Sequence, residues 1–139
     1  MAGFTYSGLK TAIQNYLDST ESTFTSTLDT FIQTTEERIL KSVELPVFRK
    51  NVNGNLTSGN TYLSMPDDFL SPYSLAVIDG SNNYSYLLLK QVSFIRDYTP
   101  AAATTGKPLY YSQFDENSFL VAPTPDSNYS VELHYNYRP

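Results

Sequence analysis

The residues that could do chemistry are few, and the most suggestive of them is His134, the single histidine of the chain. Its neighbours alternate between apolar and polar types, so His134 belongs to the polar face of a predicted strand, where a plain surface histidine is the simpler interpretation. Asp67 and Asp68 could bind a cation as adjacent carboxylates. After Met65-Pro66, however, they are more typical of turn and capping residues. Neither group predicts a catalytic or metal centre.

Charged residues offer two further candidates. Glu36, Glu37 and Arg38 are consecutive in a predicted helix, where they either solvate its surface or pair across a subunit boundary. Arg49 and Lys50 form the only adjacent basic pair, which is too small a patch for nucleic acid. The sequence contains no GxSxG nucleophile motif and no glycine-rich phosphate loop, so we predict that the protein is not an enzyme.

Composition narrows the classes of function. The 139 residues fit one domain, and 40% of them are hydrophobic, enough for a core. The chain has no cysteine, which excludes disulfides, thiolate metal sites and cysteine nucleophiles. A net charge of −5 disfavours tight binding of DNA or RNA. We expect no membrane association, because no apolar run reaches membrane-spanning length and no secretory signal begins the chain.

Two helices are expected at the start of the chain. The first is capped by Thr5 or Ser7 and ends near Leu17, and its apolar residues recur at helical spacing. A polar connector, 18–26, separates it from the second helix. So short a link makes the pair an antiparallel hairpin.

The second helix is expected to begin at Ser26 or Thr27. It ends near Glu44 or Leu45, because Pro46 restricts the residue before it and cannot continue the helix. Its apolar stripe consists of Leu28, Ile32, Thr35, Ile39 and Val43, with Phe31 and Leu40 beside it.

After Pro46 the pattern changes to strands separated by turns. We expect a hairpin in which Val47–Val52 pairs with Thr61–Ser64 across a turn at Asn53–Asn60. The elements expected next are an ordered loop at Met65–Phe69, a strand at Tyr73–Asp79, a turn at Gly80–Asn83, a strand at Tyr84–Lys90, a helical turn at Gln91–Tyr98 and a loop of small residues at Pro100–Thr105.

The last stretch, Gly106–Pro139, predicts a meander of three consecutive antiparallel strands, the first two being Leu109–Phe114 and Ser118–Ala122. The turns between them lie at Asp115–Asn117 and in the proline-rich segment 122–128. In the third strand apolar and polar residues alternate strictly, which places them on opposite faces. The apolar set is Tyr129, Val131, Leu133, Tyr135 and Tyr137.

The expected fold class is therefore α+β. An N-terminal antiparallel helical hairpin, residues 1–45, precedes an antiparallel strand-rich body, residues 46–139. Together they are expected to form a single domain, 1–139.

Several short phrases follow one another in a recognisable order along the chain. They are Leu9–Ile13, Glu36–Ile39, Tyr62–Phe69, Gly106–Tyr111, Pro123–Asp126 with Tyr129, and Glu132–Pro139. In order and spacing they resemble the head-to-tail adaptor, or connector, proteins of short-tailed bacteriophages, and the resemblance covers nearly the whole chain.

The resemblance implies a structural virion protein without catalysis or cofactor. Such adaptors form a homo-oligomeric ring, usually dodecameric, below the portal protein, where the ring extends the DNA channel and docks the tail nozzle or tail fibre protein. DNA passes through without specific binding. The implied location is the head-tail junction of the virion, after synthesis in the host cytoplasm. Members of this family often continue past the Tyr-Arg-Pro position into further helices. This chain stops at Pro139, so either a neighbouring subunit or another virion protein completes its core, or the chain is a shorter subtype or a truncated product.

Candidate contacts follow from exposure and composition. We expect subunit contacts at the helix residues Glu36, Glu37 and Arg38. The candidate partner-contact loops contain Asn53, Gly54, Asn55, Ser58, Gly59, Asn60, Ala101, Ala102, Ala103, Thr104 and Thr105.

Two alternatives remain at this point. One is a monomeric β-rich binding module, for instance for carbohydrate, or another tail or receptor-binding component; it predicts a solvent-exposed row of aromatic rings. The other is a small enzyme, which the missing motifs disfavour.

Overall fold

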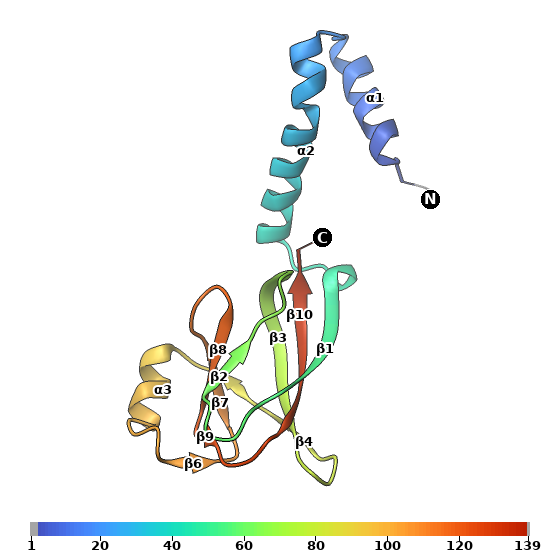
Figure 1. Cartoon of the computed structure of the whole chain (residues 1–139). Coiled ribbons are helices and arrows are strands. Elements are labelled where there is room, and N and C mark those ends of the chain that lie inside the picture. Colours follow the sequence, from blue (N-terminus) through green and yellow to red (C-terminus); the bar gives the residue numbers. More distant parts are fainter. Residues whose placement is uncertain (1–2, 139) are drawn as a thin grey trace. The chain divides into compact units, whose positions relative to one another are not determined.

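The computed structural model describes residues 3–138 and shows two compact units, Met1–Glu44 and Leu45–Pro139. The first unit is helical and the second is rich in strands (Figure 1). The predicted α+β class, a helical pair followed by an antiparallel strand-rich body, is confirmed. That the two units form one domain stays a prediction, and Pro139 lies outside the described residues. The elements are α1 (Tyr6–Leu17), α2 (Ser22–Ser42), the 3-10 helix η1 (Pro46–Phe48), β1 (Arg49–Asn55), β2 (Tyr62–Ser64), β3 (Phe69–Ile78), β4 (Tyr84–Tyr86), β5 (Leu88–Leu89), α3 (Val92–Tyr98), β6 (Thr105–Gly106), β7 (Tyr110–Gln113), β8 (Ser118–Ala122), β9 (Thr124–Pro125) and β10 (Ser130–Tyr137).

The helical hairpin forms as expected, except at the start of α2. The Thr5 side chain caps α1 by accepting a hydrogen bond from the Gly8 N–H at 3.1 Å. We predicted that α2 begins at Ser26 or Thr27, but it begins at Ser22. Hydroxyls in this first turn donate to carbonyls of the same helix, as Thr25 does to Glu21 at 3.0 Å, so they do not break it. The polar composition of 18–26, taken as a sign of a connector, therefore misplaced the boundary.

Two four-stranded sheets make up the body. The strand orders are β1-β10-β3-β4 and β2-β8-β7-β5, and β6 and β9 form a separate two-stranded pair. Most neighbouring strands are antiparallel, although β5–β7 and β6–β9 are parallel. Buried side chains from both sheets meet in one core. From the first sheet these include Leu75, Val77, Val131, Leu133 and Tyr135, and from the second Leu63, Tyr111, Phe119 and Val121.

The last strand, β10, confirms the period-two prediction. Val131, Leu133 and Tyr135 are buried, and Tyr129 and Tyr137 pack partly buried against the same core. On the opposite face Asn136 is also buried, and its amide donates to the Ser71 hydroxyl at 2.9 Å. The exposed aromatic row that a carbohydrate-binding strand would need is therefore not on β10.

The predicted meander is only half correct. β7 and β8 form the expected antiparallel pair, but β10 does not pair with β8. Instead, β10 lies between β1 and β3 in the other sheet (Figure 1). The chain changes sheets across β9, where Pro125 has no N–H to extend a ladder. Alternation defines the face of a strand, but it does not choose the neighbouring strand.

The predicted hairpin between Val47–Val52 and Thr61–Ser64 is wrong. β1 pairs with β10 along its whole length, and β2 pairs with β8. Asn53–Asn55, predicted as a turn, are therefore the end of β1. Gly54 lies opposite Val131, and non-local pairing overrides the turn preference of Asn-Gly here.

The middle of the body follows the sequence more closely. The turn at Gly80–Asn83 joins β3 to β4, and the predicted helical turn at Gln91–Tyr98 is α3. The predicted strand at Tyr84–Lys90 is divided, because β4 lies in the first sheet and β5 in the second.

Candidate assembly interface

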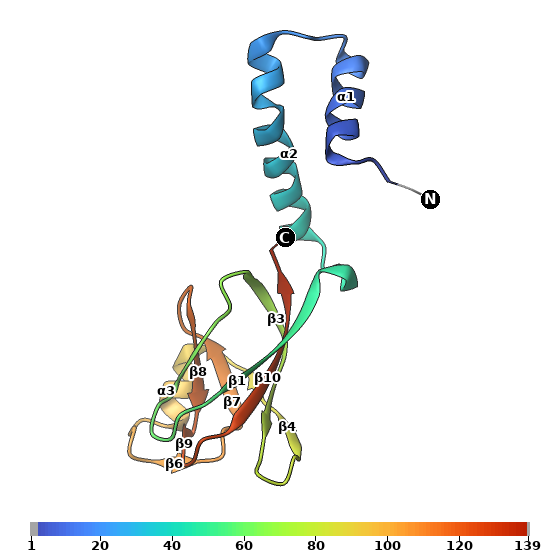
Figure 2. The same ribbon diagram turned by 45° about the vertical axis from the view of Figure 1, so that its right-hand side comes forward.

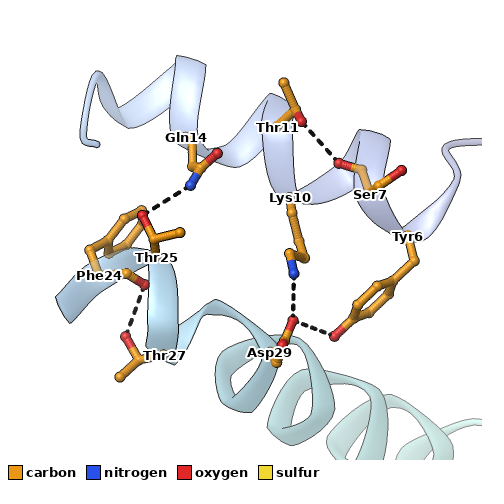
Figure 3. Close-up of polar contacts among 9 residues, drawn as sticks. All are labelled: Tyr6, Ser7, Lys10, Thr11, Gln14, Phe24, Thr25, Thr27 and Asp29. Carbon is orange, nitrogen blue, oxygen red and sulfur yellow. Dashed lines mark hydrogen bonds and ion pairs between the residues drawn. The ribbon is translucent and has the colours of Figure 1, made fainter. Parts of the chain in front are cut away.

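A polar cluster joins α1 to the first half of α2 (Figure 3). The Asp29 carboxylate accepts a hydrogen bond from the Tyr6 hydroxyl at 2.8 Å and lies 3.0 Å from the Lys10 ammonium. Farther along, the Gln14 amide donates to the Thr25 hydroxyl at 3.1 Å. The Lys10 contact, with that from Tyr6, holds the pKa of the Asp29 carboxyl below its usual value. The cluster defines which part of α2 lies beside α1.

The apolar stripe of α2 is longer than the helix that covers it. α1 has 12 residues and α2 has 21, which correspond to about 18 and 32 Å. Figures 1 and 2 show α1 beside the first half of α2 only. Leu28 and Ile32 are 1% and 7% exposed, whereas Ile39 and Val43 are 49% and 46% exposed. About half of the surface of each of these last two side chains is therefore left open.

The three charged residues predicted at a subunit contact are all exposed on this second half of α2. At about 100° per residue, Glu36 and Arg38 lie on opposite sides of the stripe, and Glu37 lies on the far face. Glu37 is 3.9 Å from Lys41 in the same helix, an exposed pair of small energetic value. The exposed end of the stripe, which we call the α2 seam (Ile39 on the helix and Val43 at its C-cap), thus has an acid on one side and a base on the other.

The two predicted contact loops meet at β9. The Gly59 N–H donates to the Pro125 carbonyl at 2.8 Å, and β6 pairs Thr105 with Thr124 and Gly106 with Pro125. The remaining candidates fall into three groups. Asn53, Gly54 and Asn55 belong to β1, and Ser58 and Asn60 are exposed. An exposed turn, closed by a hydrogen bond of 3.0 Å from the Thr104 N–H to the Ala101 carbonyl, consists of Ala101, Ala102, Ala103 and Thr104.

The other chemical candidates have structural roles. Nε2 of His134 is 3.1 Å from the Glu132 carboxylate on the same strand. The Asp68 carboxylate accepts two hydrogen bonds, from the Tyr135 hydroxyl at 2.7 Å and from the Lys50 ammonium at 2.6 Å. Among residues 3–138, no three His, Asp or Glu side chains converge as a metal site would require. Asp68 therefore links the loop before β3 to β1 and β10.

The Asp68 cluster predicts a pH dependence of stability. Hydrogen bonds from Lys50 and Tyr135 hold the pKa of Asp68 below its usual value. A lowered folded-state pKa contributes stability that is present above the unfolded pKa, near 4, and is lost as pH falls through the folded pKa. We expect Asp68→Asn to cost about 1 kcal/mol at pH 7, since the ion pair with Lys50 is partly exposed and asparagine keeps an acceptor for the buried Tyr135 hydroxyl. The measurement is urea unfolding of both chains from pH 7 to pH 2.

The difference in unfolding free energy between the original chain and Asp68→Asn reports on Asp68 alone, because both chains share all other carboxyl groups. It should shrink toward zero at the acid end. A difference that stays constant with pH would contradict a role for the Asp68 charge. At the alkaline end, burial followed by the Asp68 contact raises the pKa of Tyr135 to about 12, so its contribution persists through pH 10 and is lost above it.

Sequence reasoning missed two features, one in each unit. The α2 seam residues were assigned to the stripe, but their exposure depends on the length of α1 relative to α2, which a helical pattern does not compare. Arg96 on α3 was not singled out at all, because an isolated arginine gives no motif. It lines a pocket with Tyr62 and Thr99.

Comparison with known proteins bears on the whole chain. No helix in residues 3–138 is long and apolar enough to cross a membrane. No curated protein matches the sequence. One family model does match, described as SU10 adaptor protein, and it covers residues 4–139. This agrees with the resemblance to phage head-to-tail adaptors. The chain therefore belongs to the SU10 adaptor protein family and is a bacteriophage adaptor, a structural protein of tail assembly.

Proposed function

We propose that this adaptor assembles into a ring, dodecameric as in the resembled family, that lies below the portal, extends the DNA channel and docks the tail. The observation that carries the proposal is the α2 seam. Ile39 and Val43 continue an apolar stripe beyond the reach of α1, and half-exposed aliphatic side chains in line gain free energy when another surface covers them.

The charges beside the seam favour a second copy of the chain as the covering surface. A ring needs heterologous contacts, in which one side of a subunit meets the other side of the next. Glu36 and Arg38 lie on opposite sides of the seam, so Glu36 of one copy can meet Arg38 of its neighbour. Each contact is modest, but closing a ring ties the copies together and raises the effective concentration of every remaining contact.

Charge also suits a channel that DNA passes through. The chain carries a net charge of −5, with 9 Lys and Arg against 14 Asp and Glu. Such a surface repels phosphates and does not release counterions from DNA. DNA would therefore slide past the ring without specific binding.

The loops that meet at β9 are the proposed surface for other virion proteins. They join the exposed residues near Gly59 to the exposed Ala101–Thr104 turn through the same strand. A portal protein on one side and a tail nozzle or fibre protein on the other would place the chain at the head-tail junction. Nothing in this role requires catalysis.

The proposal is tested by sedimentation of the purified chain with the matching portal ring. We expect co-sedimentation at a fixed number of copies per portal ring, which would also give the copy number. A chain that stays at monomer mass beside an intact portal would count against the adaptor ring and favour a monomeric β-rich binding module or another tail component.

Charge reversal tests the neighbour contact. Glu36→Lys or Arg38→Glu alone should weaken each contact by about 1 kcal/mol, roughly five-fold, and the double reversal in one chain should restore it. The readout is the chain concentration needed for half-maximal co-sedimentation. A double reversal no better than either single one would rule out this pairing. Glu37→Lys reports whether the far face takes part.

A further inference from the structure

A pocket of about 210 Å³ lies within the body, where α3 and the segment after it face β2, β8 and β9. Its lining includes Tyr62, Ile95, Arg96, Thr99, Ala102 and Thr124. This volume is below the roughly 300 Å³ at which pockets for drug-sized ligands begin, so it suits a single side chain. We call it the Arg96 pocket.

Two buried hydroxyls of the Arg96 pocket have no hydrogen-bond partner among residues 3–138. They are Oγ1 of Thr99 and Oγ1 of Thr124, and Thr124 is 0% exposed. A buried hydroxyl that stays unpaired costs about 1–3 kcal/mol. Two in one small pocket indicate that a polar group from outside the chain completes them.

The charged residues around the Arg96 pocket indicate whether the incoming group is an anion or a cation. Nη2 of Arg96 lies 3.3 Å from the Tyr62 hydroxyl, and its Cζ is 5.8 Å from the Phe114 ring centroid. Within the described residues, no carboxylate comes within 4.0 Å of Arg96, and no acidic residue lines the pocket. A guanidinium and hydroxyl donors without an acid call for an anionic acceptor.

A guanidinium pairs with carboxylates and phosphates alike, so the source of the anion decides between them. The planar fork of a guanidinium matches a carboxylate in a two-bond arrangement, and either free hydroxyl can donate a further bond. Nucleic acid phosphates are disfavoured by the net charge of −5. The rim residue Ala102 belongs to the turn proposed above as a partner contact, which places a protein partner at the opening.

We propose that the Arg96 pocket binds the side-chain carboxylate of an Asp or Glu on a partner protein of the assembly. The identity of the source as a protein rests on the proposed function, whereas the carboxylate site itself does not. The partner's acidic side chain pairs with Arg96, and its oxygens accept from Thr99 and Thr124 after both threonine hydroxyls, which have less than 1 Å² of accessible surface here, turn toward the opening. The pocket therefore anchors one acidic residue in a larger contact made by the surrounding loops.

The first experiment is a titration of the isolated chain, followed by NMR of the Arg96 side chain and the threonine methyl groups. The probe is N-acetyl-aspartate N-methylamide, and the matched uncharged probe is the asparagine analogue at equal ionic strength. Sodium phosphate is the third titrant. We expect saturable shifts at Arg96, Thr99 and Thr124 with the aspartate probe, with a Kd in the millimolar range, typical of one anchored side chain.

Variants make the result specific. Arg96→Gln should remove the response, and Thr99→Val should weaken it several-fold. Arg138→Gln, an exposed arginine outside the pocket, should respond as the original chain does. Equal shifts with the asparagine probe, tighter binding of phosphate, or an unchanged response in Arg96→Gln would each overturn the carboxylate site.

A second experiment identifies the source. Arg96→Gln should still co-sediment with its own neighbours through the α2 seam, but should lose at least ten-fold in binding to the virion protein that docks at the loops. Full partner binding by Arg96→Gln would overturn the protein source and leave a small free carboxylate as the ligand. Because the titration uses the chain alone, failure of ring assembly and failure of the pocket are separate outcomes.

Discussion

Replacing Ile39 and Val43 together with glutamate is expected to abolish ring assembly while the chain stays folded. Both side chains are about half exposed, at 49% and 46%, so the hairpin itself gains little from them. Covering an aliphatic side chain fully is worth about 1.5–3 kcal/mol, and covering the remaining half of two of them about half of that each. Glutamate removes this gain and puts charge into the contact.

The combined loss is about 3 kcal/mol for every subunit contact, roughly 100-fold in affinity. The measurement is co-sedimentation with the portal ring over a range of chain concentrations. Helical circular dichroism and the melting temperature of the variant should stay close to those of the original chain.

The matched control is Thr30→Glu with Thr34→Glu. It adds the same two charges four residues apart on α2, on the face away from the stripe. It should assemble nearly normally. Equal loss in both variants would point to net charge as the cause, and a large drop in melting temperature for the Ile39 and Val43 variant alone would show that the chain covers its own seam.

Phe119→Ala is expected to have the largest effect on stability. Phe119 is 0% exposed on β8. Its ring lies edge-on to Phe69 at 5.3 Å and to Tyr111 at 5.6 Å, so it connects strands of both sheets. Truncating a buried phenylalanine costs about 3–5 kcal/mol, and the loss of two aromatic contacts places this site in the upper part of that range.

So large a loss is a substantial share of the 5–15 kcal/mol that holds a typical domain together. The melting temperature should fall by about 18 °C, at roughly 4 °C for each kcal/mol. Thermal unfolding followed by near-UV circular dichroism of the tyrosines measures it.

Phe114→Ala is the control for Phe119→Ala. Phe114 follows β7 and is 41% exposed, so the same truncation should cost only about 1 kcal/mol. Similar losses at the two positions would show that the core does not centre on Phe119.

Local periodicity explains what could be read from the sequence. Alternation in β10 placed Val131, Leu133 and Tyr135 in the core, because successive strand residues point to opposite faces whatever the neighbouring strand is. Helical spacing likewise placed Leu28 and Ile32 on the buried side of α2. The α+β class follows from these two periods and their order along the chain.

The sequence was less informative wherever local preference competes with distant partners. Asn53–Asn55 have turn residue types, yet they form the end of β1 because β10 lies beside them. The Ser and Thr residues at the start of α2 have connector composition, yet α1 holds them in a helix.

The residues of the candidate interface and pocket can likewise be separated into those that the sequence placed and those that only the fold brought together. The sequence by itself determined that Glu36 and Arg38 flank an apolar stripe, because the angle between helical residues is constant. Only the tertiary structure decided that this stripe outruns α1, that two loops distant in sequence meet at β9, and that Arg96, Thr99 and Thr124 surround one pocket. These three features depend on which distant segments of the chain pack together. The residue types at those positions give no local signal of that packing.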